Sequence, residues 1–269
     1  TQVRSRLSRL DERMTVRFDV TDGLATITLA RSEAHNALDV ATKVALAEAV
    51  QSAAAPEVRA VLITAEGKNF CVGQDLGEHV TALEADPATA MDTVGEHYNP
   101  VIRGLAALEV PIVVAIPGAC VGAGLGIALA GDIRVAGTRS SFATAFTGIA
   151  LASDSGLSCS LVEALGSSRA AGFMLLGDKV TAAQALDWGL VHRVVDDGDV
   201  LETAHTLAAS LAAGPTQAYR QVKSLIARSG LSDALDREAQ AQTALGQTAD
   251  HRAAVDAFLN KTRASFVGM

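Results

Sequence analysis

The chain has 269 residues, of which 49% are apolar but only 4% aromatic, and its formal charge is -8. Such an apolar fraction, rich in Ala, Val and Leu, excludes a disordered chain and a long charged coil. With 22 basic against 30 acidic residues, the composition argues against a nucleic-acid-binding protein. The longest apolar stretches, such as 110–119, are too short to span a bilayer, so we expect a soluble protein without membrane contact.

The cysteines and the N-terminus indicate the setting of the chain. Cys71, Cys120 and Cys159 form no CxxC pair, which favours a reducing, cytoplasmic compartment. Residues 1–15 carry four arginines but no apolar signal-peptide core, so we expect a basic N-terminal arm. The six histidines show no metal-ligand spacing, and no metal is expected.

The first half of the chain alternates strand and helix patterns. Residues 16–20 and 24–29 flank Thr21-Asp22-Gly23, which predicts a β-hairpin. A helix is predicted over about 39–54, and a strand buried on both faces over 58–64, followed by a loop to Gly77. Next come a polar, Ala-rich helical region, a second buried strand, a glycine-rich turn into a short helix, and a strand, at 87–108, 111–116, 118–130 and 133–136. This order predicts an α/β domain whose strand ends can hold a ligand.

Beyond Asp154 the chain becomes mainly helical. Helices are predicted at 155–166, 168–176 and 181–188, and a last short strand at 190–195. Three or four helical stretches follow between residues 200 and 261. No linker-like segment divides the two halves, although the acidic run 196–199 is a plausible boundary.

Two loops are candidates for a ligand site. Gly122-Ala-Gly-Leu-Gly126 follows a strand and opens a helix, where backbone N–H groups can bind an anion. Its spacing is GxGxG, so it fails as a dinucleotide fingerprint, and the glycines could instead serve close helix–strand packing. The segment 70–76 ends the neighbouring buried strand. One N–H group from each loop, directed at the same oxygen, would form an oxyanion hole.

These segments carry a family resemblance. FCVGQDL at 70–76 resembles the FCAGxDL segment of the crotonase, or enoyl-CoA hydratase/isomerase, superfamily, and 110–132 is similar to its second signature. Arg31 with Asn36-Ala37-Leu38 supports the match, which covers nearly the whole chain from Val16. The resemblance implies an α/β, ClpP-like spiral of ββα repeats over residues 16–198. It also implies a helical trimerisation region over 199–269, and hence a homotrimer or a dimer of trimers.

The resemblance further implies an acyl-CoA thioester substrate and no separate cofactor, because CoA arrives with the substrate. Its thioester oxygen would accept hydrogen bonds from the N–H groups of Gln74 and Ala123. Asp75 could instead cap the segment that follows it, and the last helix could be simply amphipathic with a solvated lysine. The residues implied to contact acyl-CoA are Ala34, His35, Val72, Asp75, Leu76, Gly122, Phe146, Phe258 and Lys261.

The acid/base residues distinguish the reactions within the superfamily. Hydratases of the standard type use two glutamates, and the matching positions here are Gly126 and Phe146, so both carboxylates are missing. Asp154 matches the aspartate of ring-epoxide and dienoyl isomerases, which is a nucleophile in the superfamily's dehalogenases. Alternatively, Asp154 is an ordinary helix N-cap. Apolar neighbours would raise the pKa of a catalytic Asp154.

Within the superfamily, the motifs are most similar to those of the 1,2-epoxyphenylacetyl-CoA isomerases of phenylacetate metabolism. We therefore predict an isomerase in which Asp154 moves a proton while Gln74 and Ala123 hold an enolate oxygen. One alternative is an enoyl-CoA hydratase with atypical acid/base residues. Another is a non-catalytic acyl-CoA-binding assembly protein that has kept only the two loops.

Overall fold

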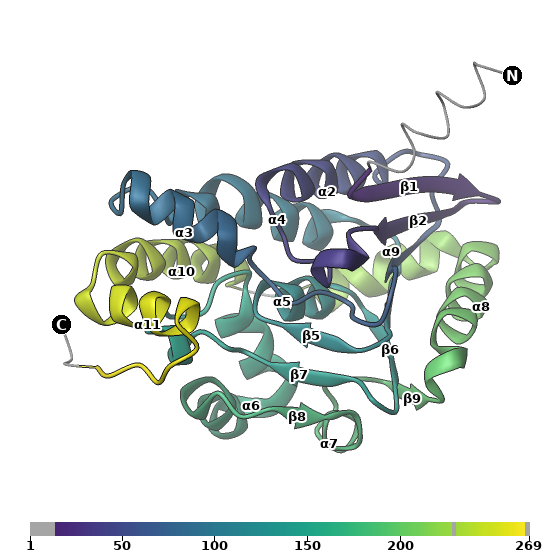
Figure 1. The fold of residues 1–269 in the computed structure, drawn as a ribbon. Coiled ribbons are helices and arrows are strands. Elements are labelled where there is room, and N and C mark those ends of the chain that lie inside the picture. Colours follow the sequence, from purple (N-terminus) through teal and green to yellow (C-terminus); the bar gives the residue numbers. More distant parts are fainter. Residues whose placement is uncertain (1–13, 228–229, 267–269) are drawn as a thin grey trace, which may run out of the picture.

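The computed structural model describes residues 14–227 and 230–266 (Figure 1). Its main sheet has the strand order β1-β2-β3-β4-β6-β9, in which β1 and β2 run antiparallel and the other neighbours run parallel. A smaller sheet has the order β5-β7-β8. The strands are β1 (Val16–Thr21), β2 (Leu24–Leu29), β3 (Ala60–Ala65), β4 (Ile112–Ile116), β5 (Ala119–Val121), β6 (Ile133–Gly137), β7 (Ser141–Ala143), β8 (Val180–Thr181) and β9 (Arg193–Val195).

Helices follow most of the strands and then take over the C-terminal part. The longest one bends at Gly166, whose backbone leaves the helical region, in agreement with the two helices predicted around it. The α-helices are α2 (Val40–Ser52), α3 (Leu76–Ala85), α4 (Asn99–Ala107), α5 (Ala123–Ala130), α6 (Leu157–Leu176), α7 (Ala182–Asp187), α8 (Val200–Ala213), α9 (Thr216–Leu225), α10 (Leu231–Gly246) and α11 (Ala249–Leu259). Short turns include the π-helical η2 (Val94–Tyr98) and the 3-10 turns η1 (Ser32–Ala34), η3 (Thr147–Ile149) and η4 (Asp197–Asp199).

The main sheet is covered on both faces, because its strands are apolar on both sides. Along β3, Val61 and Ile63 belong to the larger core cluster, which includes α2, α4 and α5. Ala60 and Leu62 point to the opposite face and belong to the cluster that includes α8. This alternation follows from the two-residue period of a strand. Buried parallel strands of this kind place the loops that follow them at one edge of the sheet.

Most predicted elements are confirmed, and the differences have local causes. In the hairpin turn, Asp22 and Gly23 both have positive φ, of 51° and 80°, as a type I′ turn requires. The predicted loop up to Gly77 is wrong at its end, because α3 begins at Leu76. The helical region predicted from residue 87 is in fact η2 and α4, which start at Val94 and Asn99. The smaller sheet was not predicted, since its strands have only two or three residues.

The last helices return to the core. Leu231 and Leu235 of α10 belong to the larger core cluster, and α11 packs against η3. Figure 1 shows α3, α10 and α11 together at one side of the molecule and α8 at the opposite side. Within the described residues, no helix has the length and apolar character that a membrane crossing requires. Of the predicted N-terminal arm, residues 1–13 lie outside the described part.

Candidate functional site

The two candidate loops meet at a pair of glycines. Gly73 and Gly122 both have positive φ, of 87° and 57°, which side chains rarely tolerate. A Cβ atom added to Gly73 would lie 3.1 Å from the carbonyl oxygen of Val121 and 3.5 Å from the backbone nitrogen of Ala123. The two chain segments are therefore in direct contact, as the sequence analysis predicts for one shared site.

Each loop offers a backbone donor at this contact. Ala123 is the first residue of α5, so its N–H has no partner within the helix. Leu38 donates to Gly73 O and accepts from Asp75 N, which leaves the N–H of Gln74 on the other side of the segment. Among the hydrogen bonds of the described residues, none uses the N–H of Gln74 or Ala123. Two uncommitted donors from adjacent segments are suited to an oxyanion.

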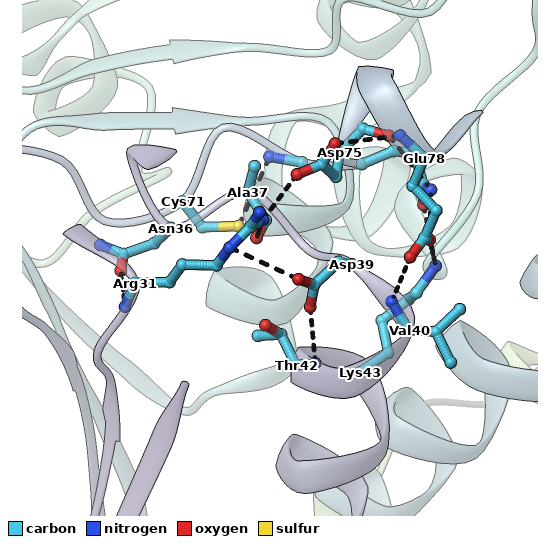
Figure 2. Close-up of polar contacts among 12 residues, drawn as sticks. Arg31, Asn36, Ala37, Asp39, Val40, Thr42, Lys43, Cys71, Asp75 and Glu78 are labelled. Atoms are coloured by element: carbon cyan, nitrogen blue, oxygen red, sulfur yellow. Dashed lines mark hydrogen bonds and ion pairs between the residues drawn. The ribbon is translucent and has the colours of Figure 1, made fainter. Parts of the chain in front are cut away.

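A network of caps fixes the segment that carries Gln74 (Figure 2). Arg31 donates to Asp75 Oδ2 at 2.6 Å and lies 3.4 Å from Asp39 Oδ2. These two aspartates are the N-caps of α3 and α2. Glu78 of α3 accepts a hydrogen bond from Val40 N, at the first turn of α2, at 2.6 Å. The N-termini of both helices are thereby joined, and Asp75 is confirmed as a cap.

Lys43 is a buried cation beside Gln74. Its side chain is only 1% exposed, and Nζ lies 2.9 Å from Glu78 Oε1 and 3.2 Å from Gln74 Oε1. The hydroxyl of Thr93 accepts a third hydrogen bond from Nζ, at 2.7 Å. The Tyr98 hydroxyl also donates to Gln74 Oε1. These contacts hold the amide side chain of Gln74.

Asp154 is a buried carboxylate with few donors. The residue is 6% exposed, Ser155 Oγ donates to Oδ1 at 2.8 Å, and Gln242 Nε2 lies 3.3 Å from Oδ2. The pKa of Asp154 is raised to about 7, mainly by burial and in part by the negative charge of Glu238, while the two hydrogen bonds and the charge of Lys43 act in the opposite direction. A carboxyl group that titrates near neutral pH is suited to moving protons.

The alternative that Asp154 caps a helix is wrong. The N-cap position of α6 belongs to Gly156, which has a left-handed backbone and no capping side chain of its own. Glu238 from α10 accepts hydrogen bonds from Gly156 N and Ser158 N, each at 2.7 Å. The carboxylate that satisfies the start of α6 is therefore Glu238, and Asp154 is left for another role.

The two positions that lack glutamates are physically filled. A Cβ atom on Gly126 would lie 2.4 Å from Ser155 Cβ and 2.6 Å from Ser155 O, so any side chain there would displace this segment. Phe146 is buried, and its Cζ atom lies 3.8 Å from a Cβ built on Gly122. Because Gly126 lies one turn beyond Ala123 on α5, its contact with Ser155 places the segment that carries Asp154 against this helix.

The remaining predicted residues lie at several distances from this centre. Val72 and Leu76 flank the Gln74 segment and are half-buried. Ala34 ends η1, and the following His35 has φ of 54° and lies 3.1 Å from the Asn69 amide. In the single chain, Phe258 is 55% exposed near the end of α11, and Lys261 is exposed just beyond it. Phe258 and Lys261 stay predictions as acyl-CoA contacts.

Five polar residues near the site were not predicted. Lys43 lies on the buried stripe of α2 with Leu46 and Val50, and this helical spacing was the available signal. Polar residues also occupy the buried stripe of α10, where the spacing gives the same signal. The residues not predicted are Lys43, Glu78, Tyr98, Glu238 and Gln242. Within the part of the chain that the structure describes, His, Cys, Asp and Glu side chains form no cluster able to hold a metal.

Comparisons with known proteins identify the family of the chain. The family model for enoyl-CoA hydratase/isomerase matches residues 19–268. The 1,2-epoxyphenylacetyl-CoA isomerase of Escherichia coli (strain K12) is 37% identical over 93% of this chain and 97% of its own. A protein of the enoyl-CoA hydratase/isomerase type from Mycobacterium abscessus has a crystal structure and is 56% identical to this chain. Its TM-score is 0.78, over 94% of this chain and 100% of its own.

A solved enoyl-CoA hydratase from Mycobacterium avium subsp. paratuberculosis K-10 is 31% identical, with a TM-score of 0.83 over 94% of this chain and 98% of its own. The predicted fold class is thus confirmed, and both hydratases and isomerases are among the similar proteins. The chain belongs to the enoyl-CoA hydratase/isomerase family of the crotonase superfamily.

Proposed function

We propose that the protein is an isomerase of enoyl-CoA or ring-epoxide acyl-CoA thioesters that works by proton transfer. The observation that carries the proposal is the buried Asp154 carboxyl, with its pKa raised to about 7 mainly by burial, on a segment that packs against α5 at Gly126. The positions of both hydratase glutamates hold Gly126 and Phe146. One proton-transfer group beside an oxyanion hole suits a reaction in which one carbon of the acyl chain loses a proton and another carbon gains one.

In the proposed mechanism, the ionised Asp154 removes a proton from a carbon of the acyl chain. The electron pair moves toward the thioester carbonyl, and the resulting enolate oxygen accepts hydrogen bonds from Gln74 N and Ala123 N. Each such donor typically stabilises the transition state by about 3–4 kcal/mol. The protonated Asp154 exchanges its proton with solvent in part of the turnovers and then donates a proton to a different carbon, so the double bond shifts and the enzyme regains its starting state.

Hydration would need a second group to activate water, and the other nearby carboxylates are engaged elsewhere. Glu78 pairs with Lys43 and accepts from Val40 N. Glu238 accepts from the backbone at the start of α6. These contacts support isomerisation over hydration, although similar proteins include named hydratases as well as isomerases.

The test is a panel of 2-enoyl-, 3-enoyl-, dienoyl- and ring-epoxide-CoA thioesters incubated in deuterated water and followed by mass spectrometry and proton NMR. We expect isomerised products, deuterium in the acyl chain, and a rate that rises as pH increases through about 7, because Asp154 must be ionised. Asp154→Asn should lose at least 100-fold in rate. Asp233→Asn, an exposed aspartate on α10, is the matched control.

Two outcomes would overturn the proposal. Rapid formation of 3-hydroxyacyl-CoA from 2-enoyl-CoA, with no isomerised product, would identify a hydratase. Absence of both product and deuterium exchange for every thioester, with binding retained, would identify a non-catalytic acyl-CoA-binding protein.

We also propose that the protein is a homotrimer or a dimer of trimers. Helix α9 supports this, because Val222, Leu225 and Ile226 at its end are 53%, 85% and 67% exposed in the single chain. Leu175 and Leu176 at the end of α6 are similarly exposed. Exposed apolar side chains of this kind favour burial against another copy of the chain. Light scattering coupled to gel filtration should give the mass of three or six chains, and a monomer would contradict it.

A further inference from the structure

Helix α10 carries two buried polar side chains that face the segment holding Asp154. Glu238 and Gln242 are four residues apart, so they lie on one face of the helix, and they are 4% and 1% exposed. Leu231 and Leu235 share that face and pack against Gly156: a Cβ atom there would lie 2.9 Å from Leu231 Cδ1 and 3.6 Å from Leu235 Cδ2. The helix is thus fixed against this segment by apolar packing as well as by polar contacts.

The two polar side chains form hydrogen bonds with residues that precede Asp154 in the chain and with residues that follow it. Gln242 Nε2 donates to Ala152 O at 2.8 Å and to Asp154 Oδ2 at 3.3 Å. Glu238 accepts from Ser153 Oγ at 3.3 Å, and from Gly156 N and Ser158 N at 2.7 Å each. Residues before and after Asp154 are therefore bound to one helix turn, which restricts where its carboxylate can lie.

Gln242 and Glu238 act on the charge of Asp154 with opposite sign, Gln242 through a hydrogen bond and Glu238 through its charge. An amide N–H donated to a carboxylate stabilises the charged form, because a neutral carboxyl oxygen is a weaker acceptor. A second buried carboxylate nearby destabilises the charged form by repulsion. Glu238 has no lysine or arginine among its hydrogen-bond partners in the described chain, so no cation there offsets its charge.

We propose that Glu238 and Gln242 are positioning residues, which hold the Asp154 carboxylate in place and together set the balance between its charged and neutral forms. The inference rests on the proposed function, because that function makes Asp154 the group that transfers a proton. The inference assigns part of the active site to α10, a helix for which the sequence analysis predicts a role in oligomerisation and no site residue.

Other charged or titratable groups also face Asp154 and must stay constant in a test. Lys43 on α2 favours the charged form of Asp154, and Tyr98 of η2 has its own pKa raised by burial and by the charge of Asp154. Ser155 donates to Asp154 from the same segment. Substitutions on α10 leave all three groups in place.

The test is to titrate the Asp154 carboxyl directly, without substrate, by carbon-13 NMR of protein labelled at the aspartate carboxyl carbon. The Asp154 signal is assigned as the one missing from Asp154→Asn. Glu238→Gln should lower the titration midpoint, because the like charge is removed while an acceptor remains. Gln242→Met should raise the midpoint, because methionine has a volume similar to that of glutamine but no N–H group to donate to Asp154. We expect shifts of about one pH unit in opposite directions.

Asp233→Asn and Gln240→Met, both exposed on α10, are the matched controls and should leave the midpoint unchanged. If Gln242→Met does not fold, as judged by circular dichroism, Gln242→Glu is used, and the added charge should also raise the midpoint. Unchanged midpoints, or shifts of both variants in the same direction, would overturn the inference.

This titration distinguishes the two proposals. Opposite shifts without isomerase activity would contradict the proposed function but leave the inference about α10 intact. When both hold, the pH at which the exchange rate is half-maximal should move with the NMR midpoint in each variant. A merely structural role for α10 would lower the rate without moving that pH.

Discussion

Gly126 connects the missing glutamate to the remaining aspartate. Hydratases of the standard type have a glutamate at this position. In this chain, Ser155 occupies the space that the Cβ atom of such a residue would need. The segment that delivers Asp154 therefore lies against α5 only because residue 126 has no side chain. The absence of a glutamate at position 126 and the placement of Asp154 both depend on this one packing contact.

This contact predicts that Gly126→Ala is damaging although alanine is small. The new methyl group would meet the backbone of Ser155 at 2.6 Å, so the segment must move, at a cost of about 1–3 kcal/mol in the free energy of unfolding. Deuterium exchange into the acyl chain should fall as well, because Asp154 moves with Ser155. Urea denaturation and the exchange assay measure both effects.

Gly172→Ala is the matched control. Gly172 lies within α6 with no atom within 4 Å of the added Cβ, so alanine there should stabilise the helix by about 0.5–1 kcal/mol. If both variants were equally stable and active, the argument about Gly126 would be wrong.

At the level of elements, the loop that carries Gln74 is fixed by the helices that flank it. Asp39 and Asp75 cap α2 and α3, and Arg31 holds both caps. Lys43 and Glu78 then join the two helices one turn further in, where Lys43 is almost completely buried. Because Gln74 lies between these contacts, the position of its N–H group depends on residues from two helices and a preceding turn.

Lys43→Met is expected to destabilise the protein by about 3 kcal/mol, because Glu78 loses its cation inside a largely buried network. Adding Glu78→Gln should recover part of this loss, since the uncompensated charge is then gone. Urea unfolding of the two single variants and the double variant measures this coupling. Arg139→Met is the control, because Arg139 is 84% exposed in its pair with Asp197 and should cost less than 1 kcal/mol. Additive effects of the two substitutions would contradict the prediction.

The elements and site residues that the sequence could predict are those specified by residues close together in the chain. The hairpin, β3 and β4 follow from turn chemistry and from apolar runs that each lie within a few residues. The family motifs located Gln74, Ala123 and Asp154 for the same reason. By contrast, the hydrogen bond from Gln242 to Asp154 joins residues 88 positions apart, and no local pattern specifies such a pair.

Across the whole molecule, a histidine pair joins the first half of the chain to its end. His79 on α3 and His251 on α11 are both buried, with their Nε2 atoms 2.9 Å apart. His251 Nδ1 lies 2.6 Å from Ile149 O and donates to it, so His251 Nε2 accepts and His79 Nε2 donates. His251 is then neutral, and a proton added at its Nε2 atom would leave two donors facing each other.

This pair predicts how stability changes in acid. Burial, together with the charges of His251 and Lys43, lowers the pKa of His79 to about 4, and burial lowers the pKa of His251. A histidine whose pKa is lower in the folded state gives stability that is present above the unfolded value of about 6.5 and is lost as pH falls toward the folded value. His79→Gln keeps a donor and does not titrate, so this variant should lose about 2 kcal/mol less than the native chain between pH 7.5 and pH 5.

The measurement is the free energy of unfolding in urea at several pH values, and the difference between variant and native chain isolates His79. This subtraction matters because Asp154 acts in the opposite direction: its pKa is raised in the folded state, so its contribution is lost as pH rises from about 4 to about 7. His205→Gln, at an exposed position on α8, is the matched control for the substitution itself. Parallel curves for His79→Gln and the native chain would show that the contact between α3 and α11 does not depend on a neutral histidine pair.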